Sequence, residues 1–179
     1  PPSITGQLTT RVCLMEILAI GATPKALSIN ICNEPSPTGT EILKGVQLEL
    51  VNNNIVIDKI ISTEKNMVTN MTALGITAVG IVNEGSILLN KVTSKNYIYL
   101  LGIPYVGNEV VKEIDNLPTL QHLSDIVKNW EVNEIIPIGS SGIKGELDKL
   151  ASNYDINYLL KDNLSIDINK SGGPCSAIL

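Results

Sequence analysis

Hydrophobic positions in the first half of the chain change between helical and strand spacing. Helical spacing predicts a first helix that begins with Thr9 or Thr10 as N-cap and stops at Gly21, just before Pro24. Alternation of apolar and polar residues then predicts a strand. This strand is expected at Ala26 to Cys32. Further patterns predict a helix at Thr40 to Asn53 and strands at Ile55 to Ile61 and Thr72 to Val82. Gly45 lies inside the second helix and suggests close packing there.

A different rhythm in the second half predicts another α/β unit. Its expected elements are strands at Tyr97 to Ile103 and Ile135 to Ile138, helices at Thr119 to Trp130 and Ile143 to Tyr154, and short strands near Tyr158, Ile166 and Cys175 to Leu179. The composition shifts between residues 83 and 96. We therefore expect a mixed α/β (α+β) fold with domains at 1–85 and 86–179, and helices on one face of the first sheet.

Composition excludes several classes of function. The 179 residues are 44% hydrophobic with no Phe, and the net charge is −5, so a stacking or basic platform for nucleic acid is not expected. No apolar run is long enough for a membrane span. Cys13, Cys32 and Cys175 lack metal or disulfide spacing, which indicates buried, reduced thiols and a cytoplasmic location. His122 is the single histidine and argues against a catalytic triad or a histidine metal cluster.

Glu16 is the most informative residue of the first helix. It stands among apolar residues on both sides of the helix, and an unpaired buried charge would be expensive, so we expect a cation beside it. Two alternatives stay open: Glu16 faces a narrow solvated strip, or it pairs with Arg11.

Three loops carry residues suited to phosphate or metal chemistry. Ser62-Thr63-Glu64 follows a predicted strand, where hydroxyls beside a carboxylate can hold magnesium, although a plain turn is the alternative. Residues 139–142 precede a helix whose N-terminus favours anions, although they lack a Walker lysine. Residues 170–174 allow close approach of the backbone to a ligand, or form a tight turn.

In this order the motifs resemble the N-terminal domain of the aminoimidazole ribonucleotide (AIR) synthase superfamily, which includes thiamine-monophosphate kinase, selenophosphate synthetase and the hydrogenase maturation protein. The similarity covers about residues 8 to 82. It rests on the helix from Glu16 to Gly21-Ala22-Thr23-Pro24, the following strand, and Ser62-Thr63-Glu64 in place of a Gly-Gly-Asp/Glu-Thr loop. Glutamate replaces the usual aspartate at position 16. The family's upstream Gly-rich, Asp-containing segment is not seen, so we expect either that sequence precedes Pro1 or that the ATPase function has been lost.

The resemblance implies that Glu16 and Glu64 hold Mg²⁺ against the phosphates of ATP and are the catalytic and metal-binding residues. Together with the three loops it assigns nucleotide contacts to Gly21, Ser62, Thr63, Lys65, Asn66, Gly139, Ser140, Gly142, Ser171, Gly172 and Gly173. It also implies a homodimer in which uncovered strands of two copies pair, with ATP near the junction; a monomer is the alternative.

Within the superfamily, the residue sequences of these motifs are similar to those of the group that includes alpha-ribazole kinase. The implied reaction is transfer of the γ-phosphoryl group of ATP to the ribose 5′-hydroxyl of a nucleoside-like substrate in cobamide salvage. Two other hypotheses remain. One is a kinase or synthetase of the same fold with another acceptor, and the other is a dimeric ligand-binding protein without catalysis.

Overall fold

The first helix, α1, spans Pro2–Ala19 in the computed structural model, which describes residues 1–179. The predicted start at Thr9 or Thr10 is therefore wrong. Proline suits the first turn of a helix, because the N–H group that it lacks would have no partner there. The predicted stop is confirmed: the helix ends just before Gly21, which has a φ of +78°.

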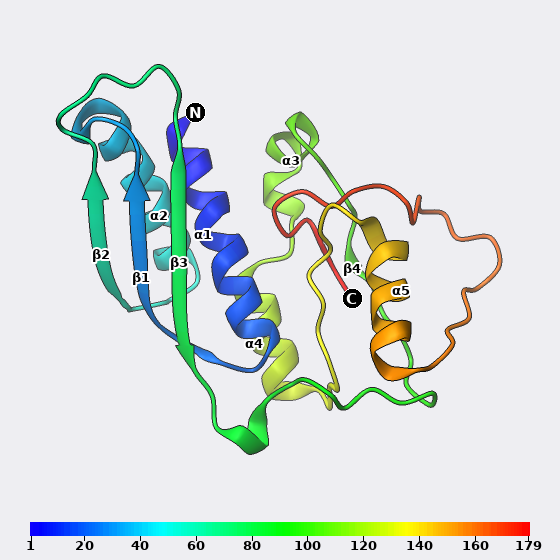
Figure 1. Ribbon diagram of the computed structural model, residues 1–179. Coiled ribbons are helices and arrows are strands. Elements are labelled where there is room, and N and C mark those ends of the chain that lie inside the picture. The colour runs from blue at the N-terminus through cyan, green and yellow to red at the C-terminus, as the bar shows by residue number, and fades with distance from the viewer. The chain divides into compact units, whose positions relative to one another are not determined.

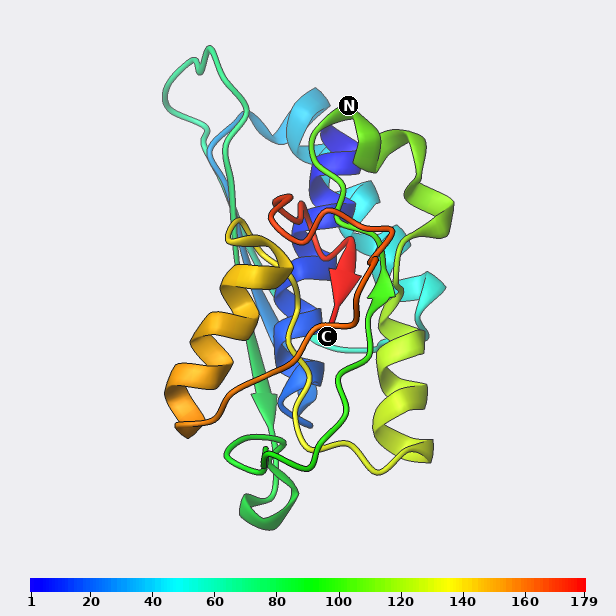
Figure 2. The same cartoon turned by 90° about the vertical axis from the view of Figure 1, so that its right-hand side faces the viewer.

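Three strands form the sheet of the first half, in the order β2-β1-β3. The central strand β1 (Thr23–Ile31) pairs in parallel with β2 (Asp58–Thr63) and antiparallel with β3 (Leu74–Ile81). Helix α2 (Thr40–Asn52) is the crossover between β1 and β2. The predicted strands and second helix exist, with bounds that differ by a few residues. Figures 1 and 2 show both helices on one side of the sheet, as expected.

The core of this part lies between the sheet and the two helices. Leu27 and Ile29 of β1 alternate with outward-facing residues and are almost fully buried, as expected for a strand with one covered face. Helices α1 and α2 touch at two glycines. A Cβ atom added at Gly45 would lie 1.8 Å from the carbonyl oxygen of Ser3, and one at Gly6 would lie 2.1 Å from that of Ile42. The close packing suggested by Gly45 is confirmed.

A buried ion pair crosses the same helix contact. Arg11 of α1 donates to the carboxylate of Glu49 of α2 from Nε at 2.7 Å and from Nη2 at 2.9 Å. Gln7 and Asn53 also donate to this carboxylate, which is fully buried. The suggested pairing of Arg11 with Glu16 is therefore wrong, because the guanidinium turns towards α2.

The chain divides into two compact units, Pro1–Ser86 and Ile87–Leu179, and the second half makes up the latter. Its core gathers around Ile138, Ile143, Leu147 and Ala177. Its helices are α3 (Asn108–Lys112), α4 (Leu120–Asn129) and α5 (Gly142–Tyr154), and its strands are β4 (Leu101–Gly102) and β5 (Ala177–Ile178). Short helical turns also occur, at Ile114–Asn116 in this unit and at Pro35–Gly39 and Glu84–Ser86 in the first unit.

Several predictions for this unit need correction. Only Leu101–Gly102 of the expected strand 97–103 is paired, and no strand forms at Tyr158 or Ile166. Residues 135–138 form no regular strand, although Ile136 exchanges two backbone hydrogen bonds with Leu179. At Tyr97 to Leu100, Tyr158 and Ile166 no neighbouring backbone is paired with the chain, and apolar alternation alone does not make a strand there. Trp130 was expected on the buried side of α4 but is 71% exposed, because the helix ends before it.

Two further expectations concern the whole chain. All three cysteines are free thiols, but Cys32 is exposed and not buried as expected, since the alternation of β1 turns it away from the core. None of the helices has the length and apolar character needed to cross a membrane. His122 is exposed and closes the N-terminus of α4, where its ring accepts from the N–H of Thr119.

Candidate functional site

The carboxyl ends of β1 and β2 lie side by side and carry the candidate site. Ile31 pairs with Thr63 at the last position of the parallel ladder. Glu64 follows directly, and its N–H donates to the carbonyl oxygen of Asn33 at 3.0 Å. Ligands of α/β proteins commonly bind at this end of parallel strands. The structure thus places Glu64 where the sequence analysis expected a phosphate or metal loop.

Glu64 organises the turn that follows β2. Its Oε1 accepts from the N–H of Asn66 at 2.5 Å and from that of Met67 at 3.2 Å. These bonds fix the direction of the carboxylate, and they engage only one of its two oxygens. A carboxylate oxygen held in this way, next to the hydroxyls of Ser62 and Thr63, is the type of ligand that Mg²⁺ prefers. The same two bonds occupy the N–H groups of Asn66 and Met67, which are then not free to hold a phosphate.

Asn33 was missed by the sequence analysis as a site residue. It is only 4% exposed, and its side chain bonds to Thr69, Met71 and Ala73. It therefore fixes the return of the chain from Glu64 to β3. Hydrogen bonds from one side chain to distant backbone leave no periodic pattern, and the only signal available was an Asn-Glu-Pro turn after a strand.

Glu34 lies beside Asn33 at the same edge. Its Oε1 accepts from the N–H of Thr38 at 3.1 Å and also from the hydroxyl of Thr38. The hydroxyl bond is the main cause that lowers the pKa of Glu34 below its ordinary value, and the backbone bond adds to it. Glu34 is thus a second ionised carboxylate at this edge, engaged in capping the turn that leads into α2.

Glu16 lies at the other end of the first unit. It is exposed on α1, and its neighbour Ile17 packs where β1 begins. A Cβ atom added at Gly80 of β3 would lie 2.6 Å from Ile17 Cγ2 and 3.2 Å from the carbonyl oxygen of Thr23, the first residue of β1. The nine residues of β1 separate this end from Glu64 by roughly 25 Å at about 3.3 Å per residue. One chain therefore does not bring Glu16 and Glu64 together. Gly21 lies with Glu16 and ends α1.

The remaining residues of the first loop differ in exposure. Thr63 is half-buried and faces Gly39, whereas Ser62, Lys65 and Asn66 are exposed around Glu64. In the described residues 1–179, no group of three or more His, Cys, Asp or Glu side chains is placed to hold a metal ion. A single chain thus offers two oriented carboxylates at this edge, Glu64 and Glu34, of which Glu34 caps a turn; one or two carboxylates hold Mg²⁺ when phosphates supply the other ligands.

The two glycine-containing loops of the second unit lie against each other. Gly172 N–H donates to the carbonyl oxygen of Gly139 at 2.9 Å, and Ser171 Oγ donates to that of Ser140 at 2.8 Å. Gly142 begins α5 with a φ of +69°, and a Cβ atom there would lie 2.8 Å from the carbonyl oxygen of Lys170. Residues 139–142 and 171–173, expected to bind the nucleotide, therefore form one paired-loop structure.

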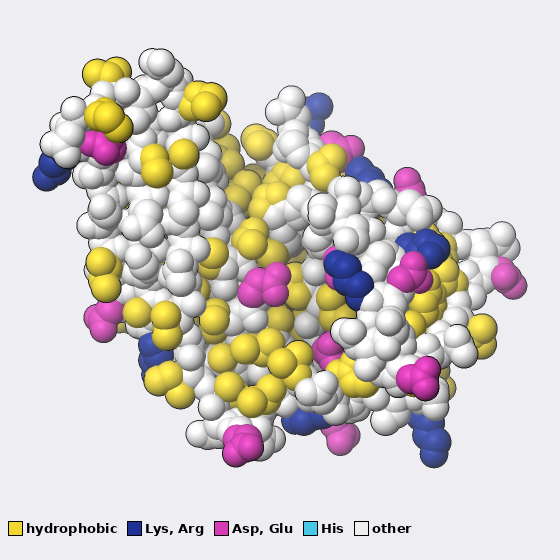
Figure 3. Space-filling model, viewed as in Figure 1, with side chains coloured by type: hydrophobic (Ala, Val, Ile, Leu, Met, Phe, Trp, Pro, Cys, Tyr) yellow, Lys and Arg dark blue, Asp and Glu magenta, His cyan; other side chains and the backbone are white.

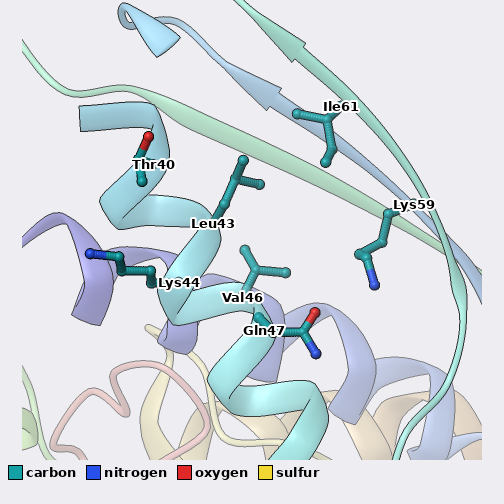
Figure 4. A pocket seen from close by; sticks show the side chains of 7 residues that line it. All are labelled: Thr40, Leu43, Lys44, Val46, Gln47, Lys59 and Ile61. Atoms are coloured by element: carbon teal, nitrogen blue, oxygen red, sulfur yellow. The ribbon is translucent and has the colours of Figure 1, made fainter. Parts of the chain in front are cut away.

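A separate hollow of about 380 Å³ lies between α2 and the free edge of β2. Figure 4 shows Leu43 and Val46 of α2 facing Ile61 of β2 across it, with lysines at its margin. The hollow is shallow, mainly apolar, and does not include Glu64 among its lining residues. It is therefore distinct from the candidate site.

Comparison with known proteins finds similarity of fold but not of sequence. No protein-family model matches the chain, and no curated protein is significantly similar to it. Solved structures do match. Hydrogenase maturation protein HypE in complex with ATP superposes with a TM-score of 0.65 and 11% identity, over 97% of this chain and 61% of HypE.

Thiamine-monophosphate kinases match in the same way. The enzyme from Stenotrophomonas maltophilia K279a gives a TM-score of 0.67 at 13% identity, over 99% of this chain and 67% of that chain. AaThiL complexed with AMPPCP and TMP gives 0.60 at 14% identity, again over 99% and 67%. The chain spans less than two thirds of the length of HypE. It has the mixed α/β, AIR synthase-like fold that HypE and thiamine-monophosphate kinase share.

Proposed function

We propose that this chain is part of an ATP-dependent small-molecule kinase whose acceptor is the ribose 5′-hydroxyl of alpha-ribazole or a similar nucleoside. One observation carries the proposal: Glu64 stands oriented at the carboxyl edge of β1 and β2, in a fold shared with a HypE–ATP complex and with a thiamine-monophosphate kinase bound to AMPPCP. The acceptor rests on the resemblance of motifs described for the sequence.

The reaction makes modest chemical demands on the protein. The bond from the γ-phosphorus to the bridging oxygen breaks, the 5′-oxygen bonds to phosphorus, and the hydroxyl proton leaves, giving a phosphomonoester and ADP. Positioning and charge neutralisation account for most of the catalysis. Mg²⁺, when bound, supplies neutralisation of the phosphate charge. Glu64 would hold the metal through its unengaged oxygen, and Lys65 would contact a phosphate from the same turn.

The role of Glu16 depends on a second copy of the chain. Since Glu16 and Glu64 lie at opposite ends of β1, we infer that any site containing both combines Glu16 of one copy with Glu64 of another. The uncovered face of the sheet suits such a pairing, because Ile60, Val79 and Ile81 are more than half exposed on it. Figure 3 shows scattered apolar side chains on this side of the molecule.

Mixing of two variants tests this arrangement. Glu16→Gln and Glu64→Gln should each lower ATP consumption with alpha-ribazole to a small residual rate, whereas Glu41→Gln, an exposed control on α2, should not. After joint unfolding and refolding of the two impaired variants, half of the dimers are mixed and one site in each mixed dimer is intact, so about a quarter of the activity should return. No recovery would contradict the shared site.

Failure of the wild-type chain to consume ATP with any nucleoside would contradict the kinase. It would favour a ligand-binding protein of the same fold, for which the replacement of paired glycines by Ser62 and Thr63 is the specific sign.

A further inference from the structure

The segment from Glu64 to Ala73, here called the Glu64–Ala73 loop, is closed at its neck by four hydrogen bonds of Asn33, next to one backbone bond from Cys32 N–H to the carbonyl oxygen of Ala73 at 3.0 Å. The carbonyl oxygen of Asn33 accepts from Glu64 N–H at 3.0 Å where the loop begins. The side chain of Asn33 holds the other end: Nδ2 donates to Thr69 Oγ1 at 2.9 Å and to the carbonyl oxygen of Met71 at 3.0 Å, and Oδ1 accepts from Ala73 N–H at 3.1 Å. Compact loops with joined ends are frequently functional.

Burial limits what Asn33 can do directly. At 4% exposure it cannot contact a bound nucleotide to any extent, and its amide already makes three of the four hydrogen bonds available to it. Its influence on a ligand must pass through the loop. The part of the loop that bears a ligand-type group is the turn at Glu64, whose carboxylate accepts two backbone N–H groups of the same loop.

We propose that Asn33 is a positioning residue for phosphoryl transfer, acting through Glu64 by holding both ends of the Glu64–Ala73 loop. This inference rests on the proposed function. The bonds at the neck set where the turn from Glu64 to Met67 stands relative to the ends of β1 and β2. That turn sets the direction of the carboxylate, so loosening the neck misplaces the group that meets the metal and the phosphates.

Two substitutions loosen the neck by different routes. Asn33→Asp keeps the size and the acceptor oxygen but removes both Nδ2 bonds and sets a carboxylate oxygen against the carbonyl of Met71. Thr69→Val removes one partner of Asn33 and leaves Asn33 itself unchanged, so it serves if Asn33→Asp does not fold. Asn30→Asp is the matched control, because Asn30 is exposed in β1 and its amide bonds only to Ser28.

The experiment measures three quantities in the full chain: affinity for Mn²⁺ in the presence of the non-hydrolysable ATP analogue AMPPCP, kcat/KM for ATP with alpha-ribazole, and the amide NMR shifts of Asn66 and Met67. Asn33→Asp should weaken Mn²⁺ binding and kcat/KM by about 10–100-fold, as loss of a residue behind a ligand commonly does. It should move both amide shifts, and Thr69→Val should do the same to a smaller degree. Asn30→Asp should change none of the three.

A double-mutant cycle distinguishes action through Glu64 from general damage. If Asn33 acts through Glu64, Asn33→Asp combined with Glu64→Gln should be no worse than Glu64→Gln alone. Additive losses, or Asn33→Asp with wild-type Mn²⁺ affinity, would overturn the inference.

The proposed function fails separately. A wild-type chain that binds Mn²⁺ but transfers no phosphoryl group contradicts the kinase, and the inference then stands or falls on Mn²⁺ affinity and the amide shifts. A wild-type chain that binds no Mn²⁺ contradicts both.

Discussion

Removal of Glu49 should destabilise the first unit strongly. Its carboxylate is fully buried and accepts from Arg11, Gln7 and Asn53, so Glu49→Ala strands the guanidinium of Arg11, which is only 5% exposed. Breaking a buried pair by removing one partner costs about 3–5 kcal/mol. That is a large part of the about 5–15 kcal/mol that stabilises a typical protein.

The Nη1 atom of Arg11 makes this cost easier to interpret. It is buried and has no hydrogen-bond partner even in the intact protein, so Glu49 is the chief compensation for the charge of Arg11. Replacing both residues, as Arg11→Met with Glu49→Leu, removes the charge together with its partner. The double variant should therefore recover most of the stability lost by Glu49→Ala.

Urea unfolding followed by circular dichroism measures the effect. Glu41→Ala is the control, because Glu41 forms an exposed pair with Lys44 on the same helix, and such pairs contribute about 0–1 kcal/mol. A loss below about 1 kcal/mol for Glu49→Ala would show that Glu49 does not compensate the buried charge of Arg11, and so would a double variant less stable than the single one.

Three further predictions follow from single sites. Gly45→Ala should cost about 1–3 kcal/mol by thermal unfolding despite better helix propensity, because the new Cβ would meet the Ser3 carbonyl, whereas Gly85→Ala, with open space around it, should be neutral. Thr38→Val should raise the pKa of Glu34 towards its ordinary value of 4.5 in a carboxyl NMR titration. Because the folded pKa of Glu34 is lowered, the stability gained from Thr38 is present above pH 4.5 and is lost as the pH falls through that folded pKa. The stabilities of wild type and variant should therefore converge in acid, and a difference that stays constant with pH would contradict this. Thiol reagents should modify exposed Cys32 before Cys13, since burial raises the pKa of Cys13, and the reverse order would contradict this.

The elements that the sequence predicted well are those whose periodic pattern is local. Helix α2 was found almost to the residue, because its apolar face repeats at helical spacing against a buried strand. The segment 97–103 was overestimated, because strand formation requires a neighbouring backbone that the pattern of one segment does not report. The hydrophobic pattern did not predict that α1 begins as early as Pro2. The first turns of α1 pack against α2 through Gly6 and Gly45, and glycines do not contribute to a pattern of apolar side chains.

The candidate site was predictable only in part. Ser62-Thr63-Glu64 could be placed at the end of a strand from its position after an apolar run, and the structure puts it there. The separation of Glu16 from Glu64 could not be predicted from the sequence, since it depends on α1 running antiparallel to β1 and on β2 running parallel to β1. The side chain of Asn33 bonds to residues that follow it by 36 to 40 positions in the sequence, and Glu49 accepts from residues that precede it by 38 and 42 positions. No spacing rule indicates contacts over such separations.

Phosphoryl transfer at Glu64 can be followed by phosphorus NMR of a reaction that contains the wild-type chain, Mg²⁺, ATP and alpha-ribazole. We expect the γ-phosphorus signal of ATP to decline while signals of ADP and of one phosphomonoester rise equally, and we expect Glu64→Gln to prevent this. Unchanged ATP, or release of inorganic phosphate without a phosphomonoester, would contradict phosphoryl transfer to a nucleoside at Glu64.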